Sequence, residues 1–151
     1  MRAGPRVAPA RHSGVSLERF MEAQARVWPG PLEEIQAGSK KGHWMWFIFP
    51  QLRGLGQSAM AQRYGIADLE EARAYLAHPV LGPRLIEITR AMLSHADKTP
   101  EAVLGPVDAM KLRSCLTLFE TADGDAVFGE GLRVFYEGRP CEATLTMIEE
   151  T

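Results

Sequence analysis

Apolar residues recur at helical spacing along most of the chain. The longest example spans 79–95, where they fall at i, i+4, i+7 and i+11: Leu81, Leu85, Ile88 and Met92. No segment alternates between apolar and polar residues over the length that a half-buried strand needs. The pattern predicts an all-α fold, a single compact domain of about seven to nine mostly short helices.

Caps and breakers set the bounds of these helices. Asp68 with Glu71 has the form of a capping box, and Thr99-Pro100-Glu101 joins an N-cap, a proline and an acid in the first turn. The predicted helices span 17–27, 32–37, 58–64, 68–77, 79–95, 99–105, 107–121, 126–136 and 141–150. The apolar run 44–49 is helical or irregular, because it is too short for periodicity to decide and no partner strand is nearby.

The domain is expected to cover 16–151, with Ser16 as the first N-cap. Residues 1–15 contain arginine, proline and glycine without an apolar period, which predicts a flexible N-terminal tail. A chain of 151 residues is most simply one domain.

Charge argues against two classes of partner. The net charge is −2, from 17 basic and 19 acidic residues. Three of the basic residues are Arg2, Arg6 and Arg11, so the predicted domain is more acidic than the whole chain. A nucleic-acid binder would need a basic body, and no apolar stretch approaches the roughly 18 residues of a membrane span. We expect a cytoplasmic protein, since the first residues also lack the apolar core of a secretory signal.

The cysteines and histidines do not predict a metal or cofactor site. Cys115 and Cys141 have neither CxxC spacing nor a histidine cluster nearby, so we expect reduced thiols, with Cys115 buried and inert. The four histidines show no metal-binding spacing. Gly54-Leu55-Gly56 lacks the third glycine and the preceding strand of a dinucleotide fingerprint.

The first candidate site surrounds the apolar run 44–49. Aromatic faces can stack on a base, lysine and arginine can hold phosphate, histidine can transfer a proton and glutamine can orient a ligand. The ligand-binding candidates are Lys40, Lys41, Trp44, Trp46, Gln51 and Arg53, and the catalytic candidate is His43. The alternative is that both tryptophans are core and His43 is a boundary residue.

The second candidate site lies on the predicted helix 107–121. Asp108 and Lys111 are 60° apart on a helix, at the edge of its apolar stripe, with Ser114 one turn further on. Asp108 is the catalytic candidate here, and Lys111 and Ser114 are ligand-binding candidates. The alternative is a solvated i,i+3 ion pair with no function.

Several segments resemble one family. The run Gly38-Ser39-Lys40-Lys41-Gly42-His43-Trp44-Met45-Trp46-Phe47-Ile48-Phe49-Pro50-Gln51 resembles the signature of a bacterial and fungal family, domain of unknown function 1810. Leu17-Glu18-Arg19-Phe20 resembles its opening, and Asp108-Ala109-Met110-Lys111-Leu112-Arg113-Ser114-Cys115 its C-terminal block. The resemblance covers about 16–149. It implies a compact all-α cytosolic domain and little about activity, because the family is largely uncharacterised; some members carry the label calpastatin.

Two hypotheses from different classes follow. In the first, the protein binds or processes a nucleotide-like or phosphate-bearing small molecule. A looser likeness to a small all-α family that acts on ADP-ribose and riboflavin-pathway compounds implies a ligand of the ADP-ribose or NAD-derived type. In the alternative, the protein is a non-catalytic protein-interaction module with an exposed apolar patch. The sequence predicts no cofactor and leaves the ligand, the reaction and the oligomeric state open.

Overall fold

The predicted helices form close to their predicted positions in a computed structural model that describes residues 17–150. The predicted tail at 1–15 and the N-cap at Ser16 lie outside these residues. The described part of the chain contains ten helices and no strand, which confirms the all-α fold class. The helices are α2 (Leu17–Ala25), α3 (Gly30–Gln36), α4 (Met45–Ile48), α5 (Ala59–Tyr64), α6 (Leu69–Ala77), α7 (Leu81–Leu93), α8 (Pro100–Leu104), α9 (Pro106–Thr121), α10 (Val127–Tyr136) and α11 (Glu142–Glu150).

Side-chain caps begin the helices where the sequence predicts them. The carboxylate of Asp68 accepts a hydrogen bond from the backbone N–H of Glu71 at 2.9 Å. The hydroxyl of Thr99 accepts one from the N–H of Ala102 at 3.1 Å. Each cap satisfies a backbone donor that has no partner within its own helix.

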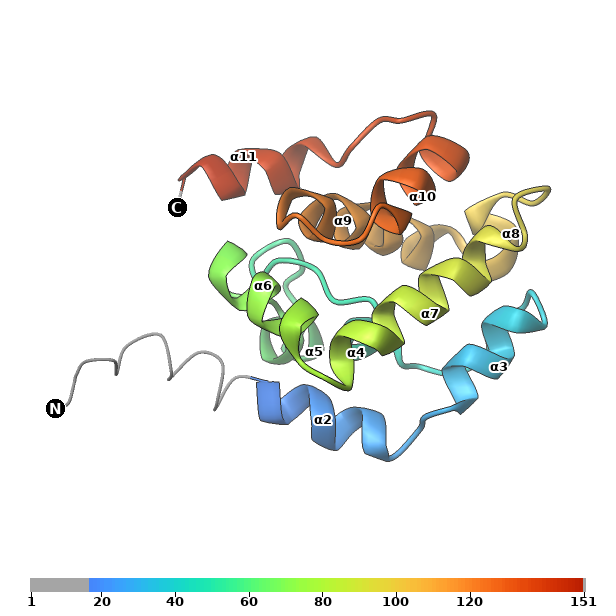
Figure 1. Ribbon diagram of the computed structural model, residues 1–151, viewed down its shortest axis with the longest axis horizontal. Helices are drawn as coiled ribbons and strands as arrows, with labels where there is room; N and C mark the ends of the chain where they lie inside the picture. Colours follow the sequence, from blue (N-terminus) through green and yellow to red (C-terminus); the bar gives the residue numbers. More distant parts are fainter. Residues whose placement is uncertain (1–16, 151) are drawn as a thin grey trace, which may run out of the picture.

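Helix α7 crosses the middle of the molecule. It packs against α3, α6 and α10. In Figure 1 it runs diagonally between α2 and α3 on one side and α9, α10 and α11 on the other. Helix α9, the longest, packs against α6, α8, α10 and α11. None of the helices within 17–150 is long and apolar enough to cross a membrane.

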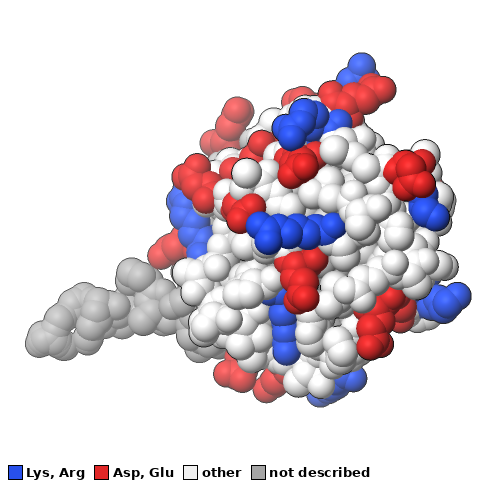
Figure 2. Space-filling view, turned by 45° about the vertical axis from the view of Figure 1, so that its right-hand side comes forward, with Lys and Arg blue, Asp and Glu red and all other residues white. Residues whose placement is uncertain are grey.

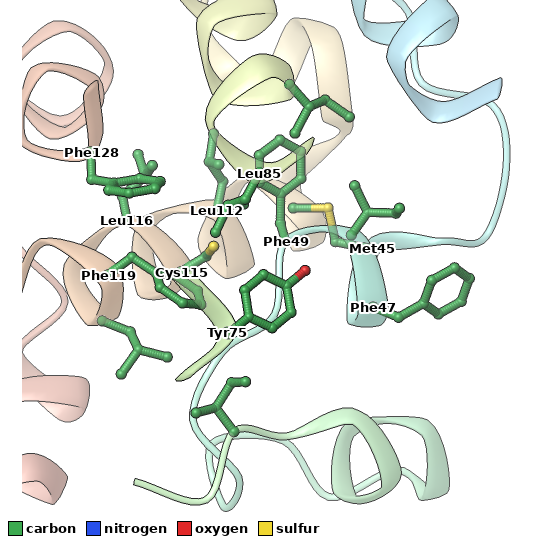
Figure 3. Packing of buried hydrophobic residues seen from close by; sticks show 14 of the residues in the cluster. Met45, Phe47, Phe49, Tyr75, Leu85, Leu112, Cys115, Leu116, Phe119 and Phe128 are labelled. Atoms are coloured by element: carbon green, nitrogen blue, oxygen red, sulfur yellow. The ribbon is translucent and has the colours of Figure 1, made fainter. Parts of the chain in front are cut away.

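A single hydrophobic cluster joins the helices. Tyr75 is fully buried within it, and its ring lies 5.1 Å from that of Phe20 and 5.4 Å from that of Phe119. Phe119 continues the contact to Phe128, with ring centroids 5.7 Å apart (Figure 3). Cys115 is also fully buried, and burial raises the pKa of its thiol well above the ordinary value. This agrees with the prediction of an inert thiol.

The apolar run 44–49 forms one short helix, α4, and then leads into an extended loop. Leu52 in this loop makes an isolated parallel bridge with Ile66. The N–H of Ile66 donates to the carbonyl of Gln51 and the N–H of Arg53 donates to the carbonyl of Ile66, both at 2.8 Å. These bonds fix the backbone of Gln51 beside the core.

Candidate functional site

The carboxylate of Glu34 organises the loop that enters the candidate site. One of its oxygens accepts hydrogen bonds from the N–H of Lys41 at 2.7 Å, the N–H of Gly42 at 2.9 Å and the indole N–H of Trp44 at 3.0 Å. Burial alone would raise the pKa of the Glu34 carboxyl group, but these three bonds and the charge of Lys40 outweigh it and lower that pKa. Glu34 therefore fixes Trp44, whose side chain is only 3% exposed.

We expect Glu34→Gln to destabilise the protein by about 1 kcal/mol at neutral pH. Because the pKa of Glu34 is lower in the folded state than in the unfolded state, its stabilisation is present above the unfolded pKa. It is lost as pH falls through the folded pKa. Urea unfolding across the acid range should therefore show the variant and the wild type converging as pH falls. Glu33→Gln, at an exposed position on the same helix, should change neither the free energy of unfolding nor its dependence on pH. If the free energies of Glu34→Gln and the wild type differed by the same amount at every pH, the role given to Glu34 would be contradicted.

An ion pair connects the two candidate regions predicted from the sequence. The ammonium of Lys40 lies 2.8 Å from one carboxylate oxygen of Asp108 and 4.9 Å from the ring centre of Trp44. Its side chain is 8% exposed. The other oxygen of Asp108 lies 3.5 Å from the ammonium of Lys111. Asp108 thus holds two lysines, one in the interior and one at the surface.

Lys111 also contacts the second tryptophan of the apolar run. Its ammonium lies 4.7 Å from the ring centre of the half-buried Trp46. The two side chains line a small cavity with Gln51, of about 10 Å³, which is room for roughly one water molecule. This cavity is too small for an organic ligand.

A larger hollow, which we call the α9–α11 groove, begins on the other side of Lys111 and Gln51. Its volume is about 390 Å³, within the range of small-molecule sites. It lies between the loop after α4, one side of α9 and the start of α11. The lining residues are Gln51, Leu55, Gly56, Val107, Met110, Lys111, Arg113, Ser114, Cys141 and Ala143.

Three of the predicted site residues, Gln51, Lys111 and Ser114, line the α9–α11 groove. The ring of Trp46 contacts the ammonium of Lys111, and the carboxylate of Asp108 pairs with the ammonium groups of both Lys111 and Lys40. Trp44 lies in the core. Lys41, His43 and Arg53 are exposed and line neither cavity. Among residues 17–150, no group of three or more His, Cys, Asp or Glu side chains could hold a metal ion.

Two further groove residues were not singled out from the sequence. Arg113 donates from its Nε to the carbonyl of Arg139 at 2.9 Å. Cys141 immediately precedes α11, and its N–H donates to the hydroxyl of Thr117 at 2.8 Å. The local signal for Cys141 is its place at the N-cap of the last helix, where a side-chain acceptor meets free backbone donors.

The surface charge does not form an extended basic patch on the face shown in Figure 2. Lysine and arginine side chains are interspersed there with aspartate and glutamate. Large exposed apolar side chains occur on α9, where Val107 is 65% and Met110 73% exposed. Both lie at the α9–α11 groove.

Comparisons with known proteins cover nearly the whole chain. The model of a family described as "Protein of unknown function (DUF1810)" matches residues 14–148. The chain is also similar to the conserved hypothetical protein Rv1873 from Mycobacterium tuberculosis, known from a crystal structure. The TM-score is 0.88 at 47% sequence identity, and the match covers 90% of this chain and 98% of that one. No curated protein matches. Sequence and fold together therefore show that the chain belongs to the DUF1810 family of proteins of unknown function.

Proposed function

We propose that the protein binds a nucleotide-like or other phosphate-bearing small molecule in the α9–α11 groove. The observation that carries this proposal is the composition of the groove wall. Its charged side chains are Lys111 and Arg113, both cationic, and no acidic residue of the described chain lines it. An anion in the groove would therefore meet two cations without an opposing carboxylate on the wall.

The other groove residues divide into an apolar side and an amide. Leu55, Val107 and Met110 provide the surface against which a ring would pack. Gln51 is half-buried and presents a side-chain amide that can donate and accept hydrogen bonds. An ADP-ribose or NAD-derived ligand, carrying both a ring and phosphates, matches this division.

The residues proposed from the sequence take different roles in this arrangement. Lys111 contacts the phosphate, while Asp108 and Trp46 hold the lysine from behind. Asp108 is then a positioning residue. His43 is exposed and outside the groove, so it takes no part in binding there.

The test measures binding of nucleotides, NAD, ADP-ribose and sugar phosphates by thermal unfolding and by calorimetric titration. A ligand at one hundred times its dissociation constant should stabilise the fold by about 2.7 kcal/mol. Lys111→Ala removes a charged hydrogen-bond donor and should weaken binding roughly tenfold or more. Lys98→Ala is the matched control, because Lys98 is exposed between α7 and α8 and lines no part of the groove. No ligand for the wild type, or equal affinity in both variants, would refute the proposal.

The second candidate function is a protein-interaction module, and the exposure of Val107 and Met110 favours it. Two large apolar side chains on one helix, beside a groove, are typical of a recognition surface. Replacing both with serine should abolish association with a protein partner and leave stability nearly unchanged. Because Val107 and Met110 also line the surface proposed for the ring, Lys111→Ala separates the two functions: it keeps both apolar side chains and should retain the protein partner.

A further inference from the structure

The sulfur of Cys141, at the start of α11, lies beside a hydroxyl donor. The hydroxyl of Ser114 lies 3.4 Å from it. The hydroxyl of Thr144 and the backbone N–H groups of Ala143 and Thr144, in the first turn of α11, also favour the charged form of this thiol. Burial alone would raise the pKa of the Cys141 thiol, but the hydrogen bond from Ser114 and the three donors of Ala143 and Thr144 outweigh burial and hold that pKa below the ordinary value.

The buried hydroxyl of Thr144 marks a place near this sulfur where a proton acceptor is missing. Thr144 is fully buried, and its hydroxyl oxygen has no hydrogen-bond partner within the described chain. It lies close enough to the sulfur of Cys141 to lower the pKa of the thiol. A buried hydroxyl without a partner is costly, whereas a thiolate beside it would accept its proton.

Ser114 is placed to respond to the same charge. Its hydroxyl has one proton and lies near two acceptors, the carbonyl of Met110 at 3.3 Å and the sulfur of Cys141 at 3.4 Å. A thiolate is the stronger acceptor of the two, because it is charged. The hydroxyl of Ser114 would then donate its hydrogen bond to the sulfur.

Cys141 is also accessible from the α9–α11 groove, unlike the fully buried Cys115. The charged side chains that line the groove with Cys141 come from α9 and are Lys111 and Arg113. The loop after α4 contributes uncharged residues to this wall. On α11 itself, the neighbouring Glu142 is exposed and does not line the groove. An incoming molecule that is negatively charged is therefore favoured.

We propose that Cys141 is a site of thiol–disulfide exchange with anionic low-molecular-weight disulfides that enter the α9–α11 groove. The thiolate sulfur attacks one sulfur of the disulfide and forms a new S–S bond. The original S–S bond breaks, and its electron pair leaves with the second sulfur as a free thiolate. Cys141 is thereby oxidised to a mixed disulfide, and the released half of the reagent is reduced. This inference does not depend on the phosphate-bearing ligand proposed above.

The experiment treats the reduced full-length protein with glutathione disulfide, which is anionic, and with cystamine, which is cationic. Intact mass and peptide mapping give the site, and the rate is followed against pH. We expect one modification per native chain, at Cys141. The pH at which the reaction rate is half-maximal should lie below the pKa of about 8.5 of a free thiol. The rate of each reagent with the protein is divided by its rate with a free thiol. This ratio should be larger for glutathione disulfide than for cystamine at low salt. Cys115→Ser should leave the reaction unchanged.

The Thr144 pair tests the mechanism directly. Thr144→Val removes the hydroxyl at constant volume and should raise the pH midpoint of the reaction rate. At pH values well below that midpoint, the variant should react roughly three- to tenfold more slowly than the wild type. Thr144→Ser keeps the hydroxyl and should react as the wild type does. The proposal would be overturned by a wild-type pH midpoint equal to that of a free thiol, or by equal modification of Cys115. It would also be overturned by a larger rate ratio for cystamine than for glutathione disulfide, or by identical pH profiles for the two Thr144 variants. The wild-type mapping and profile decide the matter even if a variant fails to fold.

Discussion

Asp108→Ala is expected to destabilise the fold by about 3 kcal/mol, whatever it does to binding. The ammonium of Lys40 is 2.8 Å from Asp108, and the side chains of the two residues are 8% and 18% exposed. Removing the carboxylate leaves the nearly buried charge of Lys40 without its ion-pair partner, with the charge of Glu34 still acting on it. The estimate lies at the low end for a buried pair, because Asp108 keeps some contact with water and Lys40 still donates to the carbonyl of Gly42. Urea unfolding gives the value.

A double variant separates the lost partner from the lost volume. In Lys40→Met/Asp108→Leu both charges are absent, so no buried ammonium is left uncompensated. We expect this variant to recover most of the stability that Asp108→Ala loses. The double-mutant cycle with the single variants Lys40→Met and Asp108→Leu should give a clear coupling energy. A loss below about 0.5 kcal/mol in Asp108→Ala would show that solvent already screens Lys40.

This prediction also affects how Asp108 is assigned a role. A residue that supports the fold through Lys40 lowers any activity by lowering the folded fraction. Ligand affinity in an Asp108 variant is therefore informative only for protein that is folded under the assay conditions. Asp108→Asn, which keeps the shape and one acceptor oxygen, is the variant suited to that measurement.

The helices were predictable from the sequence because their signals are local. The capping residues Asp68 and Thr99 lie within three positions of the donors they satisfy. The apolar spacing within 79–95 likewise depends only on the geometry of one helix, α7. Such signals do not depend on tertiary contacts. The all-α class and most helix bounds could therefore be predicted from the sequence.

The candidate site was only partly predictable, because its contacts join distant parts of the chain. Lys40, in the loop between α3 and α4, meets Asp108 on α9, and nothing in their spacing indicates an ion pair. Nor could the sequence show which tryptophan of the run faces the core, because α4 is a single turn and gives no periodicity. Cys141 is different, since its position before α11 is a local signal whose meaning depends on where that helix begins.

Trp44→Ala is expected to cost about 3–5 kcal/mol of stability, the range for truncating a buried aromatic side chain. Trp44 is 3% exposed, packs against Phe49 and donates its indole N–H to Glu34 at 3.0 Å. Trp46→Ala should cost less, about 1–2 kcal/mol, because Trp46 is only half-buried. Thermal and urea unfolding of the two variants give the comparison.

The two tryptophans should therefore separate stability from binding. Trp44→Phe keeps a ring but loses the bond to Glu34, so it should cost about 1–2 kcal/mol and raise the pKa of Glu34 toward its ordinary value. Ligand affinity of the folded Trp44→Phe protein should match that of the wild type. Trp46→Ala should instead weaken phosphate binding, because Lys111 loses the aromatic face that positions its ammonium. The reverse result, with binding lost in Trp44→Phe and kept in Trp46→Ala, would place the ligand at the loop 39–44 and away from the α9–α11 groove.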